Sequence, residues 1–329
     1  MPDEHDPDRA GGRYLIAVAN TRYPKAPHLD VPDLADARER VIQLFTEHLG
    51  YQHVSDLGLD PTKDQLTQQL RSFCRSKQRH PNDVVTVYVS GHGHVLEEGG
   101  EHVLLTTDTD PDDLYDALPT AALARTMLLG TSVRRLLLLL DTCYSGQGTN
   151  ELATVALLRA TRQWQSDVGT GFALVSSAQH DEEAEVGAFP HLLGEAVRGM
   201  SAVRGGGPIL DLPSLVDAMN AHPDRPDFHR ITLTQAGLTG VAPPFLPNPG
   251  YDPNVTPTSP LDRGPGLKGH YRQTITTGEY SVTTEFFLYS DTGVQYLLDR
   301  HGEAGAGTSR SAKSLQISAE QMPQNEGMR

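Results

Sequence analysis

Short apolar runs alternate along this chain with segments in which apolar residues recur at helical spacing. The apolar runs are at 13–19, 84–89, 135–140 and 172–177, and a further strand pattern is at 230–235. Helical patterns are at 34–49, 120–129, 150–164, 189–200 and 213–221. A capping box of Thr62 and Gln65 predicts the start of a further helix, which carries Leu66, Leu70 and Phe73. Each apolar run has the length and composition of a strand buried on both faces of a sheet. The alternation predicts an α/β fold with a mostly parallel central sheet flanked by helices.

Two of the apolar runs end in polar motifs that contain glycine. The run at 84–89 is followed by Ser-Gly-His-Gly-His, and the run at 135–140 is followed by Asp-Thr-Cys-Tyr-Ser-Gly. In an open α/β sheet the functional site lies beyond the carboxyl ends of the strands. We therefore expect His92 and Cys143 to lie side by side at one edge of the sheet, as a base and a thiol nucleophile.

At these two motifs the chain resembles the caspase-like cysteine peptidases, and within them the metacaspases and bacterial caspase-family proteins. The resemblance covers residues 13–245 in layout, and the spacing fits because a caspase histidine lies roughly 50 residues before its cysteine. The Gln-Ala-Cys-x-Gly sequence of animal caspases is absent. The resemblance implies a caspase-like three-layer sandwich. It also implies a cysteine endopeptidase of a regulated bacterial stress, defence or cell-death pathway.

The predicted chemistry rests on Cys143 as nucleophile and His92 as its base. A thiol with a pKa near 8.5 is mostly protonated at neutral pH, so it needs a base or a helix N-terminus to form the thiolate. Backbone N–H groups of Gly93 and Cys143 are the expected oxyanion donors. The second cysteine, Cys74, lies beside Phe73 on the apolar side of a predicted helix, where a buried core thiol is expected.

The resemblance also implies a pocket for the residue before the cut bond. Asp141 would line this pocket, and Asp36 would supply its second acid, so that two carboxylates select Arg or Lys. An alternative for Asp36 is a charge that complements the helix dipole. Ser176 and Ser177 would lie at the edge that receives the substrate by strand addition, or would simply end a strand.

A metal site is a weaker interpretation of the same residues. His92 and His94 could form a metal pair with His102 or Cys143, but zinc requires three or four ligands, and neither Cys-x-x-Cys nor His-Glu-x-x-His is present. The aspartates between Asp108 and Asp116 lack the spacing of a calcium-binding EF-hand. We therefore predict no metal, no cofactor and no requirement for calcium.

Net charge, apolar segment length and cysteine number limit the compartment and the binding partners that we expect. The 329-residue chain has a net charge of −15, which disfavours non-specific binding to nucleic acid or anionic membranes. No segment approaches the roughly 20 apolar residues of a membrane span. The polar start and the two cysteines predict a cytoplasmic protein without a signal peptide or disulfide framework. The expected partners are a protein substrate with a basic residue at the cleavage site and a regulatory protein.

The predicted organisation is a disordered lead at 1–12, a caspase-like peptidase domain at 13–245, and a Pro-rich linker with a partly disordered tail at 246–329. Two other functions stay open: a catalytically idle caspase-like scaffold, and a non-peptidase Cys–His amidohydrolase. The presence of both dyad residues and of Asp141 disfavours the scaffold. A nucleotide-binding domain is disfavoured because the chain lacks the glycine-rich phosphate-binding motifs.

Overall fold

The computed structural model forms two units, Met1–Pro257 and Thr258–Arg329. It describes residues 11–56, 58–96, 101–143, 170–177, 185–203, 206–226, 229–236 and 243–255, and the backbone of 269–277 and 280–288. The predictions for the helix at 150–164 and for most of the two termini lie outside these residues. The domain boundary at 245 stays a prediction.

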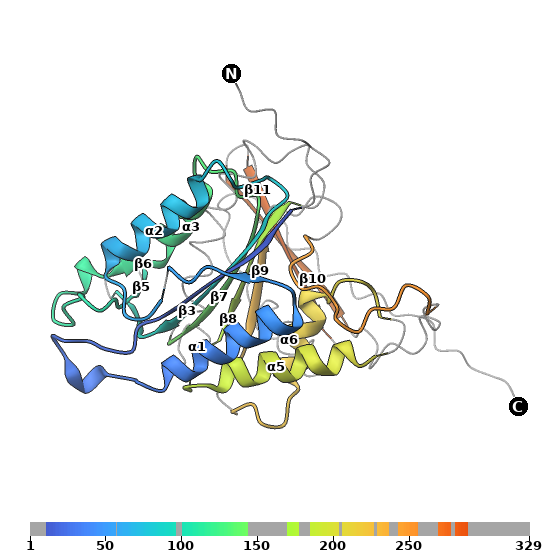
Figure 1. Cartoon of the computed structure of the whole chain (residues 1–329), viewed down its shortest axis with the longest axis horizontal. Coiled ribbons are helices and arrows are strands. Elements are labelled where there is room, and N and C mark those ends of the chain that lie inside the picture. The colour runs from blue at the N-terminus through green and yellow to red at the C-terminus, as the bar shows by residue number, and fades with distance from the viewer. Residues whose placement is uncertain are drawn as a thin grey trace, which may run out of the picture. The chain divides into compact units, whose positions relative to one another are not determined.

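A six-stranded sheet in the order β2-β1-β3-β7-β8-β9 is the centre of the first unit (Figure 1). Its strands are β1 Arg13–Ala19, β2 Gln52–His53, β3 Val84–Gly91, β7 Arg135–Thr142, β8 Gly171–Ser176 and β9 Thr232–Ala236. All neighbours are parallel except β8 and β9. The four apolar runs are the four inner strands, and apart from Arg13 and Arg135 at their starts they carry no charge. The prediction of a mostly parallel sheet is confirmed.

Helices cover both faces of this sheet. One face packs against α1 (Leu34–Gln43), α5 (Ala188–Ser201) and α6 (Leu212–Asn220), and the other against α2 (Lys63–Arg75) and α3 (Thr120–Leu128). Successive strand residues alternate between the faces. Tyr88 and Leu139 therefore belong to the α1/α5/α6 core, whereas Val87 and Leu138 belong to the α2/α3 core. The three-layer α/β sandwich is thus confirmed.

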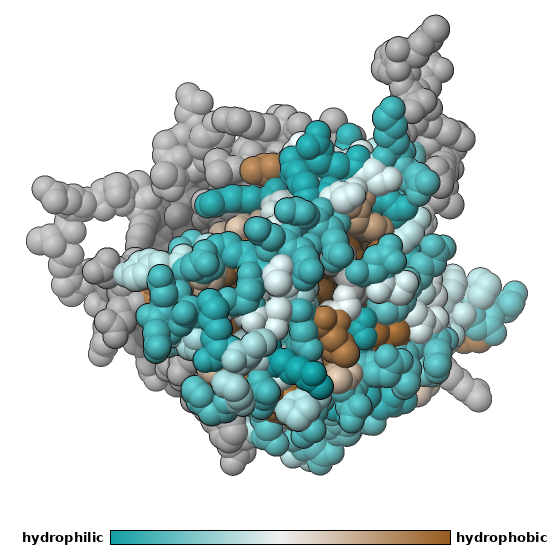
Figure 2. Space-filling view, turned by 60° about the vertical axis from the view of Figure 1, so that its left-hand side comes forward, coloured by the Kyte–Doolittle hydropathy of each residue, from teal (hydrophilic) through white to brown (hydrophobic). Residues whose placement is uncertain are grey.

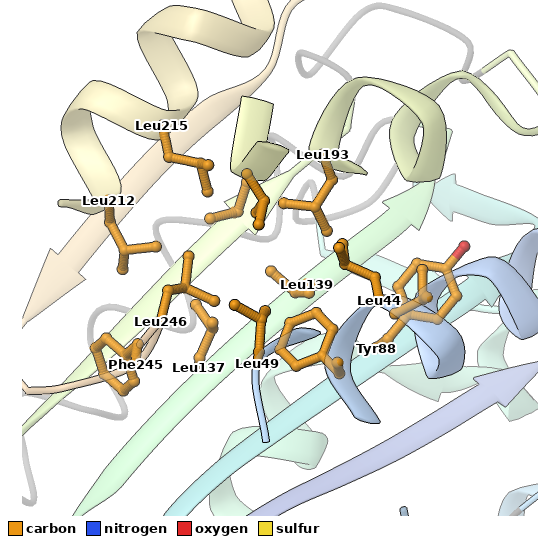
Figure 3. Close-up of a cluster of buried hydrophobic side chains, with 14 of the residues drawn as sticks. Leu44, Leu49, Tyr88, Leu137, Leu139, Leu193, Leu212, Leu215, Phe245 and Leu246 are labelled. Atoms are coloured by element: carbon orange, nitrogen blue, oxygen red, sulfur yellow. The ribbon is translucent and has the colours of Figure 1, made fainter. Parts of the chain in front are cut away.

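Leucines from helices, strands and the chain after β9 meet in the α1/α5/α6 core (Figure 3). Phe245 and Leu246 are buried there with Leu212 and Leu215, so the chain returns to the core after β9. Figure 3 shows Tyr88 at one end of the cluster, with its hydroxyl oxygen directed away from the leucines. A buried phenol of this kind requires a polar partner, and that partner lies at the site described below.

Two local features of the fold bear on the sequence predictions. Helix α2 begins with the predicted capping box, in which Thr62 and Gln65 satisfy each other's backbone N–H groups. A small antiparallel sheet was not predicted. It consists of β4 (Gly93–Val95), β5 (His102–Leu104) and β6 (Leu118–Pro119), and β4 begins directly after His92.

The described part of the second unit is an antiparallel pair, β10 (Gly269–Thr277) and β11 (Tyr280–Leu288). Residues 280–289 are rich in Val, Thr, Phe and Tyr, which is typical of strands. None of the described helices has both the length and the apolar character needed to cross a bilayer. The described surface in Figure 2 is mainly hydrophilic, with small separate apolar patches.

Candidate active site

The register of β3 and β7 determines where the two motifs meet. Ser90 pairs with Asp141, and Gly91 pairs with Thr142 at the ends of the strands. His92 and Cys143 are therefore each one residue beyond the last pair, and both leave the sheet at its carboxyl edge. This is the position in which an open α/β sheet carries its functional groups.

The loop between β1 and α1 orients His92. The carbonyl oxygen of Leu29, in the 3-10 helix Pro27–Leu29, lies 2.8 Å from Nε2 of His92. Because a carbonyl oxygen can only accept a hydrogen bond, Nε2 carries the proton in the neutral ring, and Nδ1 is left as the basic nitrogen. The His92 backbone N–H also donates to the Tyr23 hydroxyl at 3.0 Å. Sequence analysis found neither Leu29 nor Tyr23.

Gly91 gives the chain its sharp turn before His92. Its φ of +149° lies in the region that favours glycine. A Cβ at this position would lie 3.1 Å from the Tyr23 hydroxyl oxygen and 3.2 Å from the Asn20 Cβ. Both the backbone conformation and the close approach of Tyr23 thus require glycine at position 91.

The two cysteines have different surroundings. Cys143 is partly exposed, whereas Cys74 is fully buried in the α2/α3 core, as predicted. Burial is the main reason that the pKa of the Tyr23 phenol is raised, and the charges of Asp60 and Cys143 add to the rise. The Cys143 sulfur is therefore within electrostatic reach of the phenol that holds His92. Accessibility to solvent is what a nucleophilic thiol needs.

His102 lies behind Cys143, on the face of the sheet covered by α3. It is fully buried; its Nδ1 lies 2.6 Å from the Thr120 hydroxyl oxygen, and its Nε2 lies 3.0 Å from the Cys143 carbonyl oxygen. Burial lowers the pKa of His102 to about 4, so the ring is neutral at pH 7. Nε2 then donates to the Cys143 carbonyl, and Nδ1 accepts from Thr120. The ring thus fastens the backbone of Cys143 to α3.

Gly93 fits tightly between these groups. A Cβ on Gly93 would lie 2.5 Å from the Cys143 carbonyl oxygen and 2.6 Å from His102 Nε2. In the β4–β5 ladder the hydrogen bonds are made by Leu105 to His92 and by Leu96 to Glu101. Because hydrogen-bonded pairs alternate in an antiparallel ladder, the pair of Gly93 and Leu104 is a non-hydrogen-bonded one. The Gly93 N–H is therefore not used by β5.

Asp141 is the second-last residue of β7, and its side chain lies on the face of the sheet covered by α1 and α5. Its carboxylate accepts a hydrogen bond of 2.8 Å from the Tyr88 hydroxyl, and the residue is only 4 % exposed. Burial raises the pKa of Asp141 to about 6, while Tyr88, the nearby Ser177 hydroxyl and the charge of Arg40 lower it. Among the described residues no cation lies within ion-pair distance of this carboxylate, so its charge is desolvated but not neutralised.

Comparison with known proteins identifies the family. The family model for the caspase domain matches residues 13–312. This chain belongs to the caspase-domain family. No curated protein matches it.

Solved structures resemble this caspase domain only distantly. A protein from Geobacter sulfurreducens is 15% identical with a TM-score of 0.48, and the match covers 75% of this chain and 99% of that one. Caspase-1 from Spodoptera frugiperda is 14% identical with a TM-score of 0.42, and the match covers 71% of this chain and 89% of that one. Because both TM-scores are below 0.5, membership of the caspase-domain family is shown by the match over residues 13–312 alone.

Helix α1 of this caspase domain brings an arginine, rather than the predicted aspartate, towards Asp141. Burial raises the pKa values of both Asp141 and Tyr88, and the charge of Arg40 offsets part of each rise. The Arg40 guanidinium would lie 2.7 Å from a Cβ placed on Gly187, just before α5. Asp36 is exposed in the first turn of α1 and makes no hydrogen bond or ion pair with a described residue. Its role in the pocket stays a prediction.

The two serines at the end of β8 have different surroundings. Ser176 pairs with Thr232 of β9, and the two hydroxyls are hydrogen-bonded to each other. The edge of β8 is therefore paired with β9 at Ser176, and a role of this residue in binding substrate stays a prediction. Ser177 lies one residue beyond the last pair, on the same face as Asp141, and its role stays a prediction.

The remaining polar groups near the motifs are His94, the aspartate-rich loop Asp108–Asp116 and the turn after Cys143. His94 is exposed on β4. In the aspartate-rich loop, Asp108 accepts from the Lys63 N–H at 2.9 Å, and Lys25 and Lys63 lie 3.7 Å and 3.3 Å from Asp110 and Asp116. Calcium independence is not tested by these contacts. The turn after Cys143, residues 144–146, lies outside the described residues.

Proposed function

We propose that this caspase domain is a cysteine endopeptidase in which Cys143 is the nucleophile, His92 is the general base, and the scissile bond follows Arg or Lys. The observation that carries the proposal is the bond between His92 Nε2 and the Leu29 carbonyl. It leaves Nδ1 as the basic nitrogen of a ring that leaves β3 next to the partly exposed thiol at the end of β7.

The proposed reaction proceeds through an acyl-enzyme. Nδ1 of His92 takes the thiol proton, and the thiolate attacks the scissile carbonyl carbon to form a tetrahedral intermediate. The intermediate collapses as His92 returns the proton to the leaving amine, which leaves a thioester on Cys143. Water then attacks the thioester with His92 as base, and the acid product departs with the thiol restored. The N–H groups of Gly93 and Cys143 are the proposed donors to the oxyanion.

The proposed preference for Arg or Lys rests on the state of Asp141. A buried carboxylate without a cationic partner costs free energy, which a guanidinium or ammonium group from a substrate would offset. Binding of such a group would also lower the pKa of Asp141 from about 6 and keep it ionised at neutral pH. An acidic substrate side chain at this position would instead face a like charge.

The dyad is tested by substitution of each member. We expect Cys143→Ala and His92→Ala each to lower kcat/KM for Arg-containing fluorogenic peptides by about 10³-fold or more. Exposed His94, two residues from His92, is the matched control, and His94→Ala should retain activity. Circular dichroism and thermal unfolding would verify that the variants are folded. Full peptide cleavage by Cys143→Ala would refute the proposal.

The wider setting of the reaction follows from the resemblance noted in the sequence. We propose a regulated role in a bacterial stress, defence or cell-death pathway, with a protein substrate and a regulatory protein partner. Production of the protein in its host cell with and without Cys143→Ala tests this. Equal growth and survival of the two strains under every stress applied would contradict it.

A further inference from the structure

Three side chains with metal-binding atoms meet on the surface of α5 and the segment after α6, away from the Cys143 motif. His191 is in the first turn of α5, and His222 and Asp224 follow the end of α6. Their ligand atoms all lie within 4.8 Å of one another. His191 lies 31 residues before His222, so the group forms only when the fold brings α5 and the segment after α6 together.

The distances within this group are close to those of a metal-binding site. Zinc is bound at 2.0–2.2 Å by nitrogen and oxygen ligands, and its tetrahedral geometry places neighbouring ligand atoms about 3.3 Å apart. Asp224 Oδ2 lies 3.2 Å from His191 Nε2 and 3.9 Å from His222 Nδ1. The imidazole rings of His191 and His222 pack edge to face with their centroids 5.6 Å apart, and their ligand nitrogens lie within 4.8 Å of each other. Side-chain rotation at these partly exposed residues can bring the nitrogens to the separation that a metal ion requires.

We propose that His191, His222 and Asp224 bind a divalent transition-metal ion of the zinc type, with water in the remaining position. Two imidazoles and one carboxylate suit zinc or cobalt, whereas calcium and magnesium prefer all-oxygen sites. His222 Nδ1 accepts the Asp224 backbone N–H at 3.2 Å, and the metal replaces this bond. Glu195, one turn after His191, is hydrogen-bonded to Arg198 at 2.6 Å and is not a ligand.

The ion pairs of the group do not account for its arrangement by themselves. The side chains of His191 and Asp224 are 45% and 65% exposed. Exposed pairs of this kind contribute little to stability. A bound metal would instead tie the first turn of α5 to the end of α6. These helices pack against each other on the face that carries Asp141. The inference does not depend on the proposed peptidase activity.

The test uses the full chain without a histidine tag and with Cys143→Ala, so that this thiol does not compete for the metal. Zinc chloride is titrated calorimetrically, and cobalt chloride is followed by visible absorption. We expect one ion to bind per chain, with at least tenfold weaker binding in His191→Ala and in Asp224→Asn. Exposed His48, at the end of the π-helical turn Leu44–His48, supplies the control His48→Ala, which should bind as the parent does.

A second measurement separates a site in the folded protein from loose binding by histidines. A ligand that binds the folded state raises the thermal midpoint as its concentration increases. We expect zinc to raise the midpoint of the Cys143→Ala parent and of His48→Ala, but not of His191→Ala or Asp224→Asn. Unchanged affinity in both ligand variants, or no binding by the parent, would overturn the proposal.

Discussion

Two buried titratable groups flank the end of β7, and they differ in how their polar atoms are satisfied. On the α3 face, His102 is neutral, and both ring nitrogens have partners, the Thr120 hydroxyl and the Cys143 carbonyl. On the α1/α5 face, Asp141 accepts from Tyr88, but its charge has no counter-ion among the described residues. Burial shifts both pKa values towards the neutral form, to about 4 for His102 and about 6 for Asp141.

These different surroundings predict different roles for His102 and Asp141. Buried polar groups that are fully hydrogen-bonded make a structure rigid, whereas an incompletely compensated charge costs stability and is kept where a ligand can meet it. The contrast supports the proposal in which His102 fixes the backbone of the proposed nucleophile Cys143 and Asp141 binds a cationic side chain of the substrate. The two residues should therefore respond to substitution in different ways.

Of the two buried groups, Asp141 should give the larger effect on turnover. Truncation of one partner of a desolvated ion pair typically costs about 2–5 kcal/mol, so Asp141→Ala should lower kcat/KM for Arg peptides by tens- to thousands-fold. The rate of Cys143 alkylation by iodoacetamide should change little, because alkylation reports the thiol and does not use the pocket.

Two outcomes would contradict this assignment. A parallel loss of alkylation and of turnover on every peptide would mean that Asp141 only orients the Cys143 turn. Efficient cleavage after Asp, with none after Arg or Lys, would exclude a cation-binding pocket. Asp36→Ala tests the predicted second acid, and we expect a smaller loss in the same direction because Asp36 is exposed.

An intermediate effect is expected at the support of His102. Thr120→Val removes the hydroxyl that donates to Nδ1, and a buried group left unsatisfied costs about 1–3 kcal/mol of unfolding free energy. Thr120 would then no longer hold the His102 ring, which donates to the Cys143 carbonyl. The variant should therefore slow alkylation and turnover together, on Arg and Lys peptides alike. Urea denaturation and alkylation rates measured against pH would check both parts.

Thr120→Ser is the matched control, since it keeps the hydroxyl and removes one methyl group. We expect it to restore the alkylation profile of the parent. Parent-like behaviour of Thr120→Val, with normal alkylation and turnover, would mean that the contacts of His102 do not position the nucleophile.

The smallest expected effect is on the pH dependence of stability. The folded-state pKa of Asp141 is raised, so its contribution to stability is present below about pH 4 and is lost as pH rises through about 6. The pKa of His102 is lowered, so its contribution is present above about pH 6.5 and is lost as pH falls towards about 4. Between these values the two groups act in opposite directions.

Asp141→Asn should unmask the contribution of His102. The amide can still accept from Tyr88, and it does not titrate. We expect the unfolding free energy of the variant to rise by about 1–2 kcal/mol more than that of the parent between pH 4.5 and 6.5, because the opposing carboxyl is gone. Urea denaturation at the two pH values measures this difference. Identical changes in parent and variant would show that Asp141 titrates normally.

Much of the fold was predictable because its signals are local. The run at 13–19 is β1 with the same bounds, the run at 172–177 is β8 shifted by one residue, and Thr62 starts α2 as the capping box predicted. The β4–β5 pair was missed because each strand has only three residues, too few to show the alternation of apolar and polar positions that indicates a strand. Their pairing depends on the position of His92 at the end of β3.

Only those parts of the site that contain a recognisable sequence motif were predictable. The strand-end motifs indicated where His92 and Cys143 leave the sheet, and the register of β3 and β7 agrees with this. The contact between Tyr88 and Asp141 joins two strands diagonally, so it requires the register and cannot be inferred from either strand alone. Arg40 was missed because its approach to Asp141 depends on how α1 lies across the sheet.

The hydrogen bond from His92 to Leu29 has a consequence for genetics. The accepting atom belongs to the main chain, so every amino acid at position 29 carries it. With the proposed dyad, an alanine scan would single out His92 and Cys143 and would miss the Leu29 carbonyl that binds His92. Loss-of-function alleles in this loop should instead be insertions, deletions or proline replacements that displace the peptide unit. A catalogue of missense variants alone would make the loop look dispensable.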